Sequence, residues 1–159
     1  MKKGEIVQRY NDLVAVKGLT GIQLLYAVKR NKDILKPIAE QLHQSVLIPP
    51  SDEFLKHEEE LRKIILKPDN TLKEDKDIDY TKLDALLLTN KDVIAKRNAD
   101  IKEYNAIMKT EYDEEVRTFH IPLSIAPSTQ EEFDAISFMI ADMTPEQEAK
   151  FNELFNSLT

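Results

Sequence analysis

The hydrophobic residues of this chain recur mostly at three- and four-residue steps, the spacing that places side chains on one face of an α-helix. The first stripe predicts a helix over about residues 4–16. Gly18 and Gly21 follow it, so we expect this helix to end there and the next element to turn back on it. A second stripe continues to Val46 and contains Pro37, which predicts a helix that is either kinked or split at the proline.

The middle of the chain shows the same helical spacing of hydrophobic residues, interrupted by one charged segment. A Pro-Pro pair breaks the chain, and Ser51 or Asp52 then caps a third predicted helix that runs to about Leu66. Residues 67–80 contain eight charged residues in fourteen, which predicts a solvated loop with the composition of a mobile segment. Thr81 is placed to cap a short helix after this loop.

In residues 116–125 the spacing of hydrophobic residues changes from the helical one to strict alternation. Asn90 is placed to cap the longest helix, which is predicted to end near Glu115. Beyond it, apolar residues alternate with polar or small ones, the pattern of a strand, and Pro122 confines such a strand to a sheet edge or an extended arm. No partner strand is apparent, so we expect a loop or a second chain to cover its edge, which favours a dimer.

Two capping-box patterns open the last predicted helices. Ser128-Thr-Gln-Glu131 precedes a helix with apolar residues as far as Ile140. Thr144-Pro-Glu-Gln147 precedes a final helix whose apolar stripe ends at Leu158.

Glycine is absent from the whole stretch between Ile22 and Thr159. Phosphate-binding loops and tight hairpin turns need glycine, so this absence excludes the P-loop and the dinucleotide fingerprint and disfavours a β-meander. The chain is therefore predicted to be mainly α: residues 1–159 form a single-domain helical bundle with at most one short strand or hairpin near 116–125.

Catalytic and metal-binding patterns are weak. The chain has no cysteine, which excludes thiolate metal sites and thiol nucleophiles. His57-Glu-Glu-Glu-Leu61 begins as a zincin helix does, but a leucine occupies the position of the second histidine. No serine or threonine lies in a context that would activate it, and His120, on the polar side of the predicted strand, is the titratable group of greatest interest. We expect no enzymatic activity, no metal and no cofactor.

The net charge of −7 is unevenly distributed. Residues 118–159 contain seven acidic residues and one basic residue, Lys150. Such a segment repels nucleic-acid phosphates and attracts a basic protein surface, which disfavours generic nucleic-acid binding. The candidate partner-binding residues are four acidic side chains of this segment: Glu131, Glu132, Asp134 and Asp142. The alternative is that these acids only keep a helical surface soluble.

One basic stripe lies on the second predicted helix. Lys29, Lys32 and Lys36 share a helix face, and Tyr26 lies three residues before the first of them. An anionic small ligand such as a nucleotide is one candidate for this stripe, bound by stacking on the tyrosine and by charge-assisted hydrogen bonds. The alternative is the solvated back of an amphipathic helix.

Short fragments along the chain carry a family resemblance. They are Lys3-Gly-Glu5, Tyr26-Ala-Val-Lys-Arg-Asn31, Glu114-Glu-Val116 leading to Ile121, and Ile136-Ser-Phe-Met-Ile140. In this order they resemble a loose group of small proteins encoded by tailed bacteriophages and prophages. The resemblance spans about residues 3 to 140 and carries over no catalytic residue.

The resemblance implies expression in the cytoplasm of an infected bacterium or presence in a virion. The leading hypothesis is a non-catalytic interaction protein that binds a host or phage protein, for example as an inhibitor of host defence. A virion structural or assembly component and a small anionic-ligand binder are the alternatives. The start of the chain has no secretory h-region and its apolar runs are only a few residues long, so we expect no membrane partner.

Overall fold

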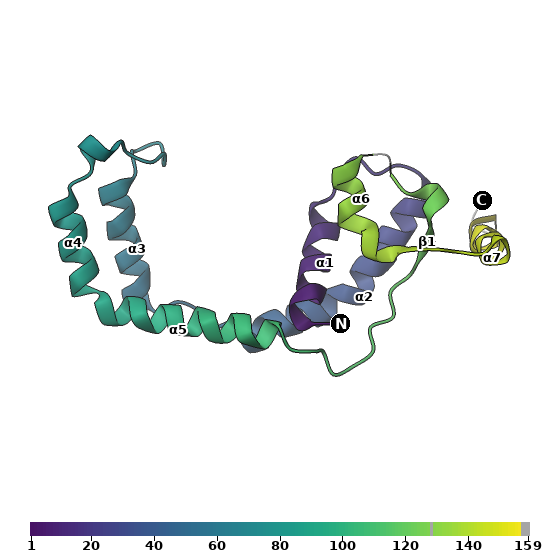
Figure 1. Ribbon diagram of the computed structural model, residues 1–159, viewed down its shortest axis with the longest axis horizontal. Coiled ribbons are helices and arrows are strands. Elements are labelled where there is room, and N and C mark those ends of the chain that lie inside the picture. The colour runs from purple at the N-terminus through teal and green to yellow at the C-terminus, as the bar shows by residue number, and fades with distance from the viewer. Residues whose placement is uncertain (128, 157–159) are drawn as a thin grey trace. The chain divides into compact units, whose positions relative to one another are not determined.

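The computed structural model describes residues 1–127 and 129–156, and it is mainly α-helical, as the hydrophobic pattern predicts (Figure 1). Its contacts divide into two compact units. The first unit comprises Met1–Val46 and Ile107–Thr159, and the second comprises Leu47–Ala106. We describe each unit by itself.

The first unit is built on two helices that pack side by side, α1 (Lys3–Ala15) and α2 (Ile22–Val46) (Figure 1). The glycines at 18 and 21 have φ values of +81° and +93°, a conformation that side chains with a Cβ rarely adopt. α2 runs without interruption through Pro37, so the predicted split does not occur. α6 (Gln130–Ile136) packs against α1. The core of the unit consists of almost fully buried apolar side chains, among them Ile6, Leu13, Leu35, Ile121, Ile136 and Met139.

A buried asparagine fastens α2 to the segment that precedes the first strand. Asn31 is completely buried, and its side-chain amide donates to the Phe119 carbonyl at 2.8 Å. Its carbonyl oxygen accepts the Phe119 N–H at 2.7 Å. The same amide also approaches the sulfur of Met139 at 3.2 Å. One side chain therefore satisfies both backbone polar groups of Phe119, as a neighbouring strand would.

The strand predicted within 116–125 is present but short. β1 (Ile121–Pro122) pairs in parallel with β2 (Ile140–Ala141), with Ile121 opposite Ile140. β2 is therefore the partner strand of β1, and it was not identified from the sequence. The 3₁₀ turns η2 (Leu123–Ile125) and η3 (Ser137–Met139) flank the pair, so the helix predicted to reach Ile140 ends at Ile136.

The C-terminal helices begin at local caps. Ser128 lies outside the described residues, and the observed cap of α6 is Thr129, whose hydroxyl accepts the Glu132 N–H. The box at 144–147 is confirmed: the Thr144 N–H donates to the Gln147 side chain at 2.9 Å, and the Gln147 N–H donates to the Thr144 hydroxyl at 3.3 Å. α7 (Pro145–Asn156) follows, and Leu158 lies outside the described residues.

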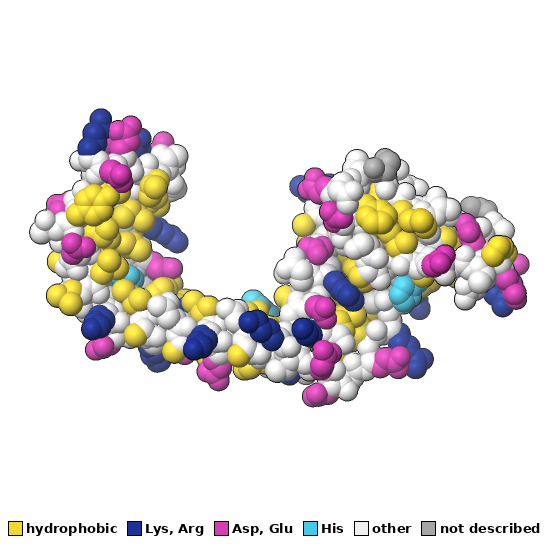
Figure 2. Space-filling view, viewed as in Figure 1, with side chains coloured by type: hydrophobic (Ala, Val, Ile, Leu, Met, Phe, Trp, Pro, Cys, Tyr) yellow, Lys and Arg dark blue, Asp and Glu magenta, His cyan; other side chains and the backbone are white. Residues whose placement is uncertain are grey.

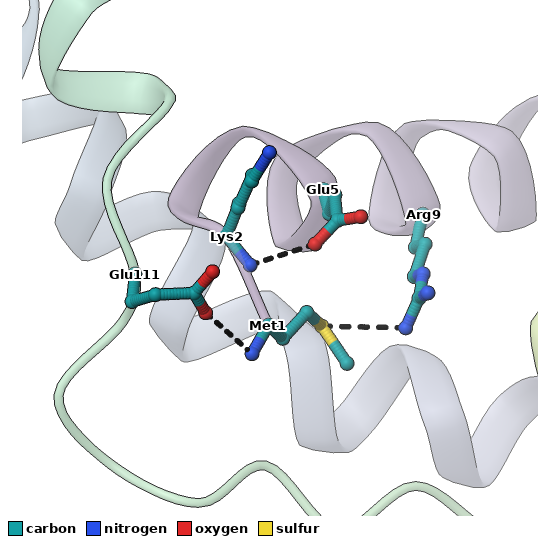
Figure 3. A network of polar contacts seen from close by, with 5 residues as sticks. All are labelled: Met1, Lys2, Glu5, Arg9 and Glu111. Atoms are coloured by element: carbon teal, nitrogen blue, oxygen red, sulfur yellow. Dashed lines mark hydrogen bonds and ion pairs between the residues drawn. The ribbon is translucent and has the colours of Figure 1, made fainter.

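The first residues of the chain are held by a network of polar contacts (Figure 3). The Glu5 carboxylate accepts the Lys2 N–H at 2.7 Å, which caps α1, and the Met1 ammonium lies 3.0 Å from the Glu111 carboxylate. Backbone bonds join the same two segments, since the Lys3 N–H donates to the carbonyl of Thr110. The segment after residue 108 is thereby paired with the start of the chain.

The second unit contains α3 (Asp52–Ile65), α4 (Tyr80–Thr89) and most of α5 (Lys91–Met108). Ser51 caps α3, as predicted. Asp79, rather than Thr81, caps α4 by accepting the Lys82 N–H. The Asn90 side chain donates to the Leu86 carbonyl, so it closes α4 and does not cap α5 as predicted.

α5 ends at Met108, well before the predicted end near Glu115. The reason is local: both the amide and the hydroxyl of Thr110 donate to the Ile107 carbonyl, at 3.0 and 2.6 Å, and this turn ends the helix.

The charged loop at 67–80 is exposed and contains hydrogen-bonded turns. Asp69 accepts from both the amide and the hydroxyl of Thr71, and Asn70 takes a φ of 64°. The short 3₁₀ turn η1 (Asp75–Asp77) follows, and the Tyr80 hydroxyl donates to Asp75 at 3.1 Å. The loop also bonds back to α3, since the Lys73 N–H donates to the Ile65 carbonyl at 2.8 Å.

Replacing Asn31 tests the bridge between α2 and Phe119. Asn31→Leu keeps the site filled but removes the partner of both backbone groups of the half-buried Phe119, so we expect a loss of about 1–3 kcal/mol in the free energy of unfolding. Urea unfolding followed by circular dichroism measures this loss. Asn98→Leu, at an exposed asparagine of α5, is the matched control, and an equal loss in both variants would contradict the role given to Asn31.

The cap of α1 predicts a pH dependence. The Lys2 N–H bonded to Glu5 lowers the pKa of this carboxyl below its usual 4.5, with Arg9 adding a smaller effect. A carboxyl whose pKa is lower in the folded state than in the unfolded state stabilises the folded protein above pH 4.5. This stabilisation is lost as the pH falls through the lowered folded-state pKa.

Glu5→Gln should therefore be less stable than the unchanged protein at neutral pH, and the gap should close below pH 4.5. Urea unfolding at a series of pH values measures it. Glu103→Gln, at an exposed glutamate within α5, controls for the loss of one negative charge. A gap that stays constant down to pH 3 would refute the cap assignment.

Candidate functional site

An acidic cleft lies in the first unit between the end of α1 and the start of α6. It encloses about 650 Å³. Four carboxylates line it, from Asp12, Glu131, Glu132 and Asp134, and the single basic side chain of the lining is Lys17. Small apolar residues, including Ala15 and Ala135, complete its wall. Three of the four acidic residues predicted to bind a partner are thus brought together, and α1 adds a fourth carboxylate.

Neutral hydrogen bonds orient two of these carboxylates. The Gln8 side chain donates to Asp12 at 2.8 Å, and the Gln130 side chain donates to Asp134 at 2.7 Å, each across one helical turn. Within residues 1–127 and 129–156, none of the four carboxylates forms an ion pair. The amide donors fix the positions of the carboxylates without cancelling their charge.

Gly18 lets the backbone approach the cleft. A Cβ at this position would lie 2.7 Å from the Oε1 atom of Glu132, and the φ of the residue is +81°. Glycine therefore suits this backbone conformation, and a larger residue here would displace the tip of the Glu132 side chain.

Asp142 lies away from this cleft. It lines a separate cavity of about 450 Å³ together with His120 and Lys150. The structure therefore separates Asp142 from the other three predicted acids. His120 is exposed and lies before β1, outside the strand in which it was predicted.

The predicted basic stripe on α2 is only partly assembled. Tyr26, Lys29, Arg30 and Asp33 line a small cavity of about 300 Å³, whereas Lys32 and Lys36 are not in its lining. Lys29 forms an ion pair with Asp33 at 3.0 Å, and Lys36 lies 3.9 Å from Glu40.

The Tyr26 ring already has aromatic neighbours. It makes edge-to-face contacts with Phe119 and Phe155, with ring centroids 5.6 and 5.4 Å apart. These contacts hold α7 and the segment before β1 against α2. Tyr26 therefore has a packing role that the sequence pattern did not reveal.

The burial of His57 was not predicted from the sequence. Its side chain is only 4% exposed on α3, and its Nδ1 is the one buried side-chain polar atom without a hydrogen-bond partner among the described residues. His57 lines a groove between α3 and α4 in the second unit. The signal that could have revealed this groove is the helical spacing of Glu53, His57, Glu60 and Ile64.

The described residues contain no group of three or more His, Asp or Glu side chains placed to hold a metal ion. Among them there is also no helix with the length and apolar character needed to cross a membrane. No protein-family model, no curated protein and no solved structure matches this chain. The acidic cleft must therefore be interpreted from its own geometry.

The two glycines before α2 provide a matched test of the contact at the cleft. Gly18→Ala and Gly21→Ala both force alanine into positive φ, which should cost each about 1 kcal/mol of unfolding free energy. A Cβ at Gly21 meets nothing within 4 Å, whereas one at Gly18 displaces the tip of Glu132. Because that tip is flexible, urea unfolding should give similar losses. A loss at Gly18 that is several-fold larger would show that the Glu132 carboxylate is held rigidly.

Proposed function

We propose that the protein is a non-catalytic interaction protein and that the acidic cleft binds a basic segment of another protein. The observation that carries this proposal is the set of four carboxylates around one cavity of about 650 Å³, none of which forms an ion pair with another described residue. A segment bearing lysine or arginine side chains would place its cations among these carboxylates. Charge of one sign steers such a partner and raises the association rate.

The form of the cleft supports a peptide-like ligand. Its wall contains alanine and valine side chains between the carboxylates, which suits the aliphatic stems of lysine and arginine. A nucleic acid would meet like charge here and is disfavoured.

The proposed biological setting is that of a phage protein acting on a host or phage protein, for example as an inhibitor of host defence. The support is the family resemblance of the sequence alone. A role as a virion component and a role as a nucleotide binder at the basic stripe stay alternative predictions. The pairing of Lys29 with Asp33 weighs against the nucleotide, because it offsets one of the cations.

Charge reversal in the cleft tests the proposal. Glu131→Lys/Asp134→Lys should weaken binding of a fluorescent oligoarginine peptide by at least roughly tenfold, because two attractive carboxylates become repulsive. Fluorescence anisotropy at low and at physiological salt measures the affinity, which should fall as salt rises.

The matched control is Glu103→Lys/Glu153→Lys, which gives the same net charge with two exposed acids outside the cleft. Equal weakening by both double variants would show that only net charge matters and would refute the cleft as the site. An oligoglutamate peptide of equal length should not bind any of the proteins.

A further inference from the structure

The second unit contains one buried side chain, and it is a histidine. Every residue of Leu47–Ala106 is described, and only His57 among them is buried, with 4% of its surface exposed. The Nδ1 atom of this ring has no hydrogen-bond partner. The fourteen buried hydrophobic side chains of the described residues all belong to the first unit. The second unit therefore has an unsatisfied polar group where the first unit has an apolar core.

The packing between α3 and α4 is open to water. The two helices lie side by side, and Figure 2 shows hydrophobic side chains at the surface over them. Leu55 of α3 and Leu87 and Leu88 of α4 are exposed. Within residues 47–106, no hydrogen bond or ion pair joins α3 to α4. Apolar contacts that are only partly shielded from water therefore hold these two helices together.

An arginine connects α5 to the start of α3. The Arg97 guanidinium donates to the Ile48 carbonyl at 2.7 Å and lies 5.8 Å from the centre of the Phe54 ring. The Phe54 ring in turn contacts the His57 ring, with the two centroids 6.0 Å apart. None of these contacts involves α4, so they do not strengthen its attachment to α3.

We infer that the second unit opens as a separate cooperative step while the first unit stays folded. In the open state α3 and α4 separate and expose their apolar side chains. A region with little buried apolar surface opens at a lower free energy than the core of the same protein. The first unit holds both ends of the opened segment, because residues 46 and 107 belong to it. The entropy cost of closing a loop rises only slowly with its length, so a long open segment is compatible with a folded first unit.

This inference is independent of the proposed function, because the acidic cleft belongs to the first unit. The residues that line the cleft keep their positions when the second unit opens, so the opening should not change the affinity of the cleft for a basic peptide.

The first test is hydrogen exchange of the full chain, followed by mass spectrometry at urea concentrations below the main unfolding transition. The amides of α3 and α4 should be protected at least roughly a hundredfold less than those of α1 and α2, yet more than those of an unstructured peptide. Added urea should lower the protection of α3 and α4 together, because they open in one step. Equal protection of all four helices, or no protection of α3 and α4, would overturn the inference.

The second test replaces the buried histidine. His57→Leu puts an apolar side chain of similar size at this position and removes the unsatisfied Nδ1. The protection of α3 and α4 should therefore rise by roughly tenfold, while that of α1 and α2 stays the same. His43→Leu, at an exposed histidine of α2, is the matched control and should leave the protection of α3 and α4 unchanged. The absence of a gain in His57→Leu, or a gain that extends equally to α1 and α2, would refute a separate opening controlled by His57.

Discussion

The first unit depends on one buried amide. Asn31 satisfies the N–H and carbonyl of Phe119 with a single side chain, at 2.7 and 2.8 Å, where no neighbouring strand is available. Without these bonds two half-buried backbone groups would lose their partner, which costs free energy. With Phe119 fixed on α2, Ile121 is placed to pair with Ile140, and the aromatic rings around Tyr26 can pack.

The acidic cleft follows from this closed core. Ile136 is completely buried in α6, and Leu13 is almost completely buried in α1, so these helices hold the cleft between them. The carboxylates then project from helices whose positions the core has already fixed. The second unit contrasts with this arrangement, because its three helices leave their apolar side chains partly exposed.

The sequence predicted local features better than distant pairings. Ser51 and the box at Thr144 were predictable because a cap needs only the next three residues. The pairing of Ile121 with Ile140 was not, because it depends on Asn31, and α5 ended early because Thr110 bonds back to Ile107. Three acids of the candidate site are close together in sequence and were predicted as a group. Asp12 was not predicted, because it joins them only through the packing of α1 against α6. Asp142 lines a different cavity, which its distance along the chain did not reveal.

The proposed binding at the acidic cleft relies on electrostatic attraction. The cleft carries four carboxylates and one lysine, so its attraction for a basic partner is screened by salt. The core that holds α1 and α6 together is apolar and is not screened in this way, so a rise in ionic strength should weaken capture of the partner without loosening the cleft itself.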